Sequence, residues 1–234
     1  MHNSPQKHAI FIVLFAALGF GALQIPLAHL AGSKTAFTLF DAFAPVTGAL
    51  LGMWTGIIAV AAMQIANFIV HGSTVLDAGT IIRFFPMLFA VAVFSKKSRL
   101  NLIVPFLAIA AFLAHPIGRM VWYFSLFWTI PLIAHHFRDR FLFARALGAT
   151  FTAHAVGGAL WIWAFALPAS VWKSLIPVVI TERSVFAVGI CASYYVLVNA
   201  LAMIQRLSKK SLGLPLHPAF LIPSLRANAT NTES

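Results

Sequence analysis

Hydrophobic residues in this chain of 234 residues fall into long unbroken runs, separated by short polar or basic stretches. Runs such as residues 57–66 and 185–201 do not alternate between apolar and polar positions, so they do not match the strands of a transmembrane β-barrel. They match helices, because a spanning helix of roughly 20 apolar residues satisfies its own backbone hydrogen bonds where water is absent. The pattern therefore predicts an all-α, polytopic transmembrane helical bundle.

The runs predict up to eight spans, at residues 9–31, 37–51, 53–70, 78–94, 100–114, 120–134, 144–167 and 176–204. Residues 37–51 are short and run almost directly into the next span, so they form either a half-helix or part of one long bent helix. Residues 100–114 and 120–134 are also short and lie only five residues apart, which favours a tight helical hairpin. We therefore expect six to eight spans.

Composition divides the chain into two parts. Residues 1–204 carry the apolar runs and form one transmembrane domain, whereas residues 205–234 are polar, contain prolines and predict a loosely held cytoplasmic tail. Hydrophobic residues make up 61% of the chain and charged residues only 9%, so a soluble fold could not hide the apolar surface. The single cysteine, Cys191, lies in an apolar run, which excludes a disulfide framework and a CxxC motif.

Basic residues lie mostly between and after the apolar runs, although a net charge of +11 first points to nucleic acid. With eight spans and the N-terminus inside, the outer loops contain only Lys34 and Lys173. The inner segments contain Lys7, Lys96, Lys97, Arg99, Arg138, Arg140, Arg145, Arg206, Lys209, Lys210 and Arg226. This bias predicts a multi-pass protein of the cell membrane with both termini in the cytoplasm and no nucleic-acid partner. A seven-span chain with the N-terminus outside and the second and third spans fused fits the charges nearly as well.

Ionisable residues inside or beside the spans are the candidates for chemistry, because membrane helices rarely carry them without a partner or a function. In the eight-span arrangement most of them gather toward the outer face: Asp41, His71, Asp77, Arg83, His115, Arg119, Lys173, Glu182 and Arg183. Four tryptophans lie near the same level: Trp122, Trp161, Trp163 and Trp172. Together they predict an outward-opening pocket for a small molecule. The alternative is an interfacial tryptophan belt with charges that reach the lipid headgroups.

Arg83 and the Glu182–Arg183 pair are the strongest candidates, since each lies within or at the mouth of an apolar span. Each anchors a ligand or belongs to an internal salt bridge, such as Glu182 with Arg83 or Arg119. The three arginines favour a ligand with a carboxylate or phosphate, stacked on a tryptophan. The predicted ligand-binding residues are Asp77, Arg83, Arg119, His154, Trp163, Trp172, Glu182 and Arg183.

Histidine spacing argues against a metal or haem centre. No His-x3-His or His-x2-Glu pair lies on one predicted helix, and His135 and His136 fall in the basic inner loop, away from His115 and His154. The sequence also lacks Gly-x-Ser-x-Gly, paired catalytic carboxylates and a phosphate loop. We therefore expect neither an enzyme nor a bound metal or cofactor.

Small residues form a strip on the first span, at Ala16, Ala17, Gly19, Gly21 and Ala22. The spacing of Ala17 and Gly21 lets another helix approach closely. This surface either packs helices within the protein or docks a partner subunit.

Four local features resemble the substrate-binding (S) component of energy-coupling factor (ECF) transporters, the vitamin and metal uptake systems of prokaryotes. Residues 15–22 are similar to the Ala-rich first helix of that family. Residues 37–56 resemble its short second helix with a Gly-rich turn into the third. Residues 64–94 resemble the third helix, outer loop and fourth helix. Residues 154–172 and 176–195 look like the penultimate helix, aromatic outer loop and last helix that wall the pocket.

The resemblance implies a membrane-embedded subunit that captures a small vitamin-like or precursor metabolite from outside. A transmembrane coupling subunit, docked on the first helix at Ala17 and Gly21, and cytoplasmic ATPases would then drive import. Family members usually have six helices, so the hairpin at residues 100–134 would be an addition. The alternative function is an intramembrane enzyme or redox protein acting on a lipid or quinone, and a structural or assembly protein without a ligand is a third.

Overall fold

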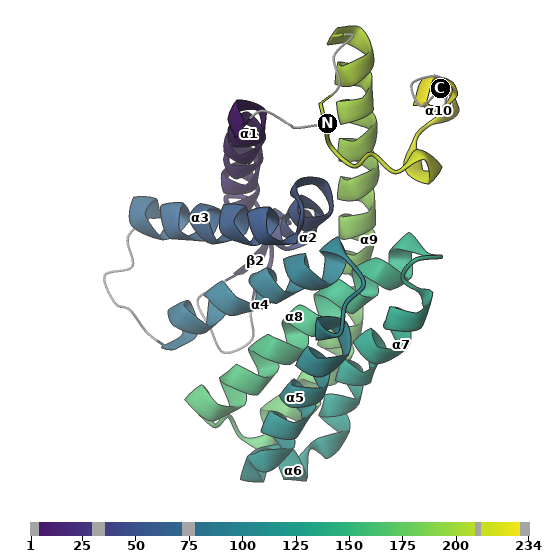
Figure 1. Ribbon diagram of the computed structural model, residues 1–234. Coiled ribbons are helices and arrows are strands. Elements are labelled where there is room, and N and C mark those ends of the chain that lie inside the picture. Colours follow the sequence, from purple (N-terminus) through teal and green to yellow (C-terminus); the bar gives the residue numbers. More distant parts are fainter. Residues whose placement is uncertain (1–4, 30–35, 72–77, 209–211, 230–234) are drawn as a thin grey trace.

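The computed structural model describes residues 5–29, 36–71, 78–208 and 212–229, and most of them are helical (Figure 1). The long helices are α1 (Pro5–Leu23), α3 (Met53–His71), α4 (Ala78–Ser95), α5 (Leu100–Ala114), α8 (Leu142–Phe165) and α9 (Ala169–Ser208). The shorter ones are α2 (Leu39–Leu51), α6 (Pro116–Met120), η1 (Trp122–Thr129), α7 (Ile130–Phe137), η2 (Pro218–Phe220) and α10 (Pro223–Ala229), of which η1 and η2 are 3-10 helices. Within the described residues, the fold is all-α apart from one antiparallel hairpin of β1 (Pro26–His29) and β2 (Ala36–Thr38).

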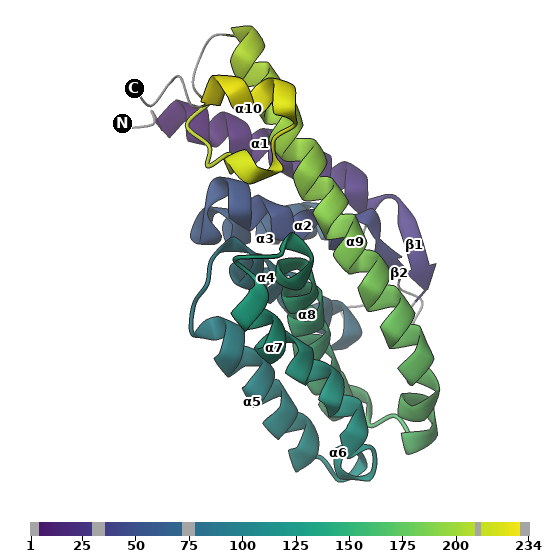
Figure 2. The same ribbon diagram turned by 90° about the vertical axis from the view of Figure 1, so that its right-hand side faces the viewer.

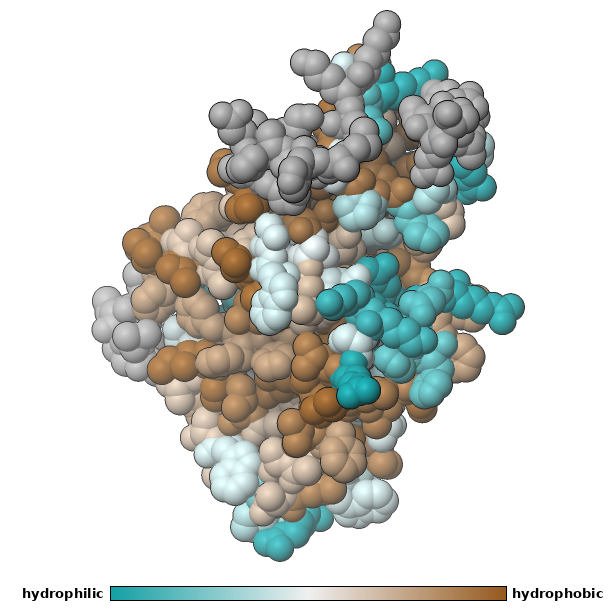
Figure 3. All heavy atoms as spheres, in the orientation of Figure 1, coloured by the Kyte–Doolittle hydropathy of each residue, from teal (hydrophilic) through white to brown (hydrophobic). Residues whose placement is uncertain are grey.

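Three of the described helices are long and apolar enough to cross a membrane: Met53–Val70 in α3, Ala78–Ser95 in α4 and Ala169–Ser208 in α9. Large apolar side chains on these helices, such as Ile58 and Val188, are more than half exposed. Hydrophobic side chains also cover much of the face seen in Figure 3. Contact with lipid would remove this surface from water, so the structure supports a membrane protein. The number of six to eight spans stays a prediction.

The predicted apolar runs coincide largely with helices, but the first and last runs differ in their bounds and the run at residues 120–134 differs in form. The sequence predicts a first helix to residue 31, whereas α1 ends at Leu23 and the chain enters β1 at Pro26, whose ring cannot continue a helix. The last helix begins at Ala169 instead of residue 176, so Trp172 lies on α9 and not in an outer loop. Residues 120–134 do not form one regular helix, because η1 occupies most of this stretch before α7 begins.

Glycines set the corner between α2 and α3. Gly52 separates the two helices with φ of 88° and ψ of 159°, a conformation that is nearly restricted to glycine. Beyond the corner the helices pack closely, since a Cβ atom on Gly56 would lie 2.6 Å from the Cα of Gly48. The second predicted span is therefore a separate short helix and not part of one bent helix.

Two hydrophobic clusters hold the helices together. The first contains residues of α1, α2, α3 and α4, of the start of α8 and of the C-terminal half of α9, and includes the buried side chains of Val91 and Ile190. The second joins α5, η1 and the C-terminal half of α8 with the start of α9, around Phe112, Trp128 and Ile162. Helices α4 and α8 pack side by side in opposite directions (Figure 1), and α9 runs the length of the molecule (Figure 2). The space between α4, α8 and α9 is where polar residues gather.

Two arginines satisfy the carbonyl end of α4. Nη1 of Arg138 donates to the Val93 carbonyl at 2.6 Å, and Arg145 donates to the carbonyls of Phe94 and Ser95. The Arg145 guanidinium also lies 4.4 Å from the centre of the Phe94 ring. The last carbonyls of a helix have no partner within the helix, and their partial negative charge favours cations. Two of the basic residues assigned to the inner face therefore also fasten the end of α7 and the start of α8 to the end of α4.

Residues 212–229 pack against α9, so the expectation of a loosely held tail is wrong for them (Figure 2). Nδ2 of Asn199 donates to the Phe220 carbonyl at 2.9 Å, and Oδ1 of Asn199 accepts from the Ile222 N–H at 2.7 Å. Leu221 and Leu225 are buried in the first hydrophobic cluster. A few apolar anchors among prolines and polar residues are enough to dock this segment.

Candidate functional site

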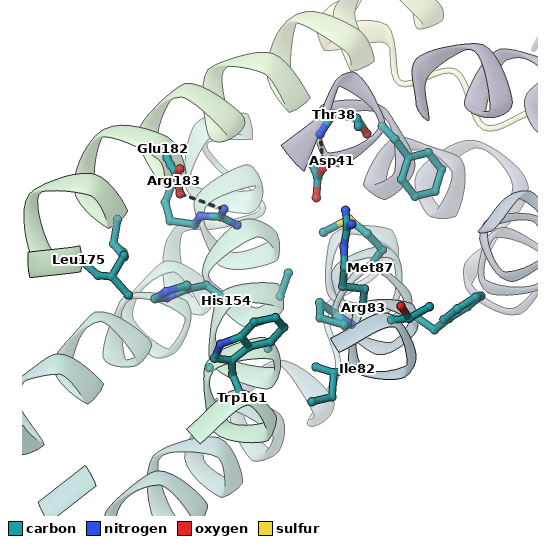
Figure 4. A pocket seen from close by; sticks show the side chains of 18 of the residues that line it. Thr38, Asp41, Ile82, Arg83, Met87, His154, Trp161, Leu175, Glu182 and Arg183 are labelled. Atoms are coloured by element: carbon teal, nitrogen blue, oxygen red, sulfur yellow. Dashed lines mark hydrogen bonds and ion pairs between the residues drawn. The ribbon is translucent and has the colours of Figure 1, made fainter. Parts of the chain in front are cut away.

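A cavity of about 380 Å³ opens between α2, α3, α4, α8 and α9 (Figure 4). This volume falls in the range of ~300–1,000 Å³ that is typical of small-molecule sites. Most of the wall is apolar or aromatic, and a few polar side chains converge on it. The lining residues include Asp41, Arg83, Met87, Phe124, His154, Trp161, Trp172, Val179, Glu182 and Arg183.

One face of α8 forms a wall of the cavity. His154, Gly157, Gly158 and Trp161 lie there because positions i, i+3, i+4 and i+7 share one side of an α-helix. A Cβ atom on Gly158 would lie 2.6 Å from Cζ2 of Trp128, so this glycine lets the indole pack against the helix. The wall thus places one histidine and one tryptophan along the cavity.

The start of α9 forms another wall by the same periodicity. The side chains of Trp172, Leu175, Val179, Glu182 and Arg183 repeat at helical spacing along it. Trp172 is buried, and its Nε1 donates to the Leu167 carbonyl at 3.2 Å, which fixes the indole. This wall is aromatic at the beginning of the helix and charged about three turns later.

Charged groups from α2, α4 and α9 converge on the cavity (Figure 4). Oδ2 of Asp41 accepts from the Thr38 N–H at 2.9 Å and completes a capping box at the start of α2. The Arg83 side chain points toward Asp41 in Figure 4, and Asp41 interacts electrostatically with both Arg83 and Arg183. The carboxylate therefore has a structural role in α2 and also faces the cations of two other helices.

Arg183 is only 2% exposed, and its guanidinium lies among an acid, a hydroxyl group and an aromatic ring. Nη2 lies 3.7 Å from Oε2 of Glu182, and Nη1 donates to Oγ1 of Thr150 at 3.5 Å. The guanidinium carbon is 4.8 Å from the centre of the Phe186 ring. Glu182 therefore pairs with its sequence neighbour, whereas the sequence offered Arg83 or Arg119 as its partner. A buried cation needs such compensation, because removing it from water is costly.

His154 is neutral in this arrangement. Nε1 of Trp128 donates to Nδ1 of His154 at 3.0 Å, and the rings of Phe124 and Phe151 lie against the imidazole. An indole N–H can only donate, so Nδ1 carries no proton and the ring proton resides on Nε2. His154 is therefore fixed in one tautomer by a residue that the sequence analysis did not single out.

The structure brings together most of the predicted ligand-binding residues. The cavity is lined by Arg83, His154, Trp172, Glu182 and Arg183. Arg119 is exposed on α6 and does not line the cavity. Trp163 is 57% exposed and turns to α5, where its Nε1 donates to the Ala111 carbonyl at 2.9 Å. Asp77 lies outside the described residues.

Two further cavity residues could have been added to the ligand set from the sequence. Asp41 follows Thr38 by three positions, the spacing of a capping box, and it lies in an otherwise apolar run. Trp161 follows His154 by seven positions and shares its helix face, whereas Trp163 follows by nine and lies half a turn away. Helical phase therefore favoured Trp161, although the sequence analysis selected Trp163.

The two predicted docking residues are accessible on α1. Ala17 and Gly21 are both exposed, and a Cβ atom on Gly21 would meet no other atom within 4 Å. Docking of a partner there stays a prediction.

Among the residues that the structure describes, no three His, Cys, Asp or Glu side chains are arranged to hold a metal ion. Comparison of the chain with protein-family models, with curated proteins and with solved structures found no match.

Proposed function

We propose that this protein is the membrane-embedded substrate-binding subunit of an ECF-type uptake transporter, which captures a small vitamin-like or precursor metabolite from outside the cell. The observation that carries the proposal is the cavity, where aromatic walls on α8 and α9 meet charged groups from α2, α4 and α9. Small-molecule sites combine apolar walls with a few convergent polar groups in this way. Charges on apolar helices that face a cavity are also typical of substrate sites in membrane proteins.

Import by this route requires partner subunits, because the sequence contains no phosphate loop that could bind ATP. In the proposed complex, a transmembrane coupling subunit docks on α1 and cytoplasmic ATPases supply the energy. The exposed strip at Ala17 and Gly21 supports this docking, since small residues let two helices approach closely. The positive-inside bias of the sequence supports an arrangement with both termini in the cytoplasm and the cavity toward the outside.

Ligand binding to the purified full-length protein tests the proposal. We expect at least one compound in a panel of vitamins and their precursors to raise the melting temperature in detergent. Trp161→Ala should abolish that shift, because Trp161 lines the cavity. Trp163→Ala is the matched control: it removes the same side chain from the other side of α8 and should leave the shift intact.

Uptake provides the second arm of this test. In cells that co-express the coupling subunit and ATPases, Arg83→Ala should reduce accumulation of the compound that binds. The proposal fails if no compound in the panel raises the melting temperature, or if Arg83→Ala leaves uptake of a compound that binds unchanged.

A further inference from the structure

The formal charges of the side chains that line the cavity sum to zero. Asp41 and Glu182 contribute two negative charges, and Arg83 and Arg183 contribute two positive charges. The sequence alone favours an acidic ligand, because it assigns three arginines to the site. The structure leaves Arg119 outside the cavity and adds Asp41 to its wall. An anionic ligand would therefore give the site a net negative charge in surroundings of low dielectric constant, where an uncompensated charge is costly.

The arginines already face carboxylates. Arg183 lies 3.7 Å from Glu182, and Asp41 interacts electrostatically with Arg83 and Arg183. A carboxylate or phosphate of a ligand would have to compete with these groups. If it displaced one of them, a partly buried protein carboxylate would lose its compensation.

His154 offers a different kind of contact, a neutral hydrogen-bond donor. The Trp128 indole occupies Nδ1, so the proton of the imidazole is on Nε2. Since the ring lines the cavity, this N–H can meet an acceptor on a ligand. A carbonyl oxygen or an aromatic ring nitrogen fulfils that role without bringing a charge.

The rest of the wall fits a flat apolar body. Aromatic and aliphatic side chains from several helices surround the space, among them Met87, Phe124, Trp161, Trp172 and Val179. Aromatic faces of this kind favour stacking or edge contacts with a ring.

We propose that the cavity selects an uncharged, planar molecule with a hydrogen-bond acceptor that contacts Nε2 of His154. This inference rests on the proposed function and specifies the substrate class of the same site. The charge pairs of Asp41, Arg83, Glu182 and Arg183 set this preference by excluding ligands with a net charge of either sign.

Three derivatives of naphthalene with the same body and different charge test the inference on the full-length protein in detergent: the carboxamide, the carboxylate and the aminomethyl compound. We expect the neutral carboxamide to bind at least about tenfold more tightly than either charged compound, measured by titration calorimetry. His154→Phe should remove this advantage because the donor is lost. His154→Gln should restore part of it, since the Gln amide can accept from Trp128 and also donate to the ligand.

A change of cavity charge supplies the second test. Glu182→Gln removes one negative charge from the wall and should shift the preference toward the carboxylate. Asp139→Asn makes the same change in net charge on an exposed side chain in the connection between α7 and α8, which does not line the cavity, and should leave the preference unchanged. The inference is overturned if the wild type prefers a charged probe, if it binds none of the three, or if Glu182→Gln behaves like the control. A charged metabolite that binds and is transported would overturn this inference alone, whereas failure of the whole vitamin panel would remove the proposed function.

Discussion

Close packing of α2 against α3 depends on a single glycine, whose missing side chain can be tested directly. A Cβ atom on Gly56 would lie 2.6 Å from the Cα of Gly48, and backbone cannot rotate away as a side chain can. Gly56→Ala should therefore destabilise the protein by ~1–3 kcal/mol, the usual cost of overpacking. On α1, Gly21→Ala adds the same methyl group where no atom lies within 4 Å, so it should be neutral or slightly stabilising.

Thermal unfolding of the two variants in the same detergent, followed by tryptophan fluorescence, measures this difference. A Gly56→Ala protein that melts at the wild-type temperature would show that the two helices are not in close contact. Such a result would also contradict the position of Asp41 in the cavity wall, because α2 carries this residue.

Single residues also show where sequence reasoning about the site succeeds and where it stops. Arg83 and Glu182 were predictable, because a charge in an apolar run must face protein, water or a partner. The spacing in the sequence shows that Trp161, and not Trp163, shares a helix face with His154. Choosing Trp161 also required knowing that this face points inward. The Trp128–His154 hydrogen bond was not predictable, since it joins η1 to α8 across 26 positions through tertiary packing.

The carbonyl end of α4 depends on a cation supplied by a later part of the chain. Arg138→Gln removes the donor that reaches the Val93 carbonyl, and we expect a loss of ~1.5–3 kcal/mol, typical of hydrogen bonds to charged groups. Arg140→Gln is the matched control, because Arg140 is exposed two positions later and its guanidinium lies over the ring of the neighbouring Phe141. Hydrogen exchange over residues 88–97 should speed up only in Arg138→Gln. Equal exchange in the two variants would mean that Arg138 does not hold the helix end.

Helices were the elements that the sequence predicted best, because apolar runs bounded by polar residues are a local signal. The β1–β2 hairpin was missed since its strands are only four and three residues long and lie beside a helix-like apolar run. The docked segment after α9 was also missed, because its few anchors, such as Leu221 and Leu225, become apolar contacts only when the chain folds back. Long-range pairing of this kind has no periodic pattern in the sequence.

The antiparallel pair of α4 and α8 has one end where basic residues gather and an opposite end that lines the cavity. The end of α4 and the start of α8 lie together, and basic residues gather there, including Lys97 and Arg145. The opposite end brings Arg83 near the start of α4 together with Trp161 near the end of α8, at the cavity. Figure 3 shows hydrophilic side chains beside α7 and hydrophobic ones over much of the remaining face. If the first end is cytoplasmic, as the positive-inside rule predicts, the cavity end faces outward.

Cysteine accessibility in intact cells tests this orientation, and the chain suits the experiment because Cys191 is its single cysteine. In a Cys191→Ser background, Ser170→Cys near the start of α9 should react with a membrane-impermeant maleimide added from outside. Asp139→Cys, in the basic connection between α7 and α8, should react only after the membrane is permeabilised. Both positions are exposed in the structure, and they lie at opposite ends of α8. Asp139 is a suitable site because acidic residues contribute little to topology. If only Asp139→Cys is labelled from outside, the orientation is the reverse of the predicted one. If both variants are labelled equally, the two ends lie on the same side of the membrane.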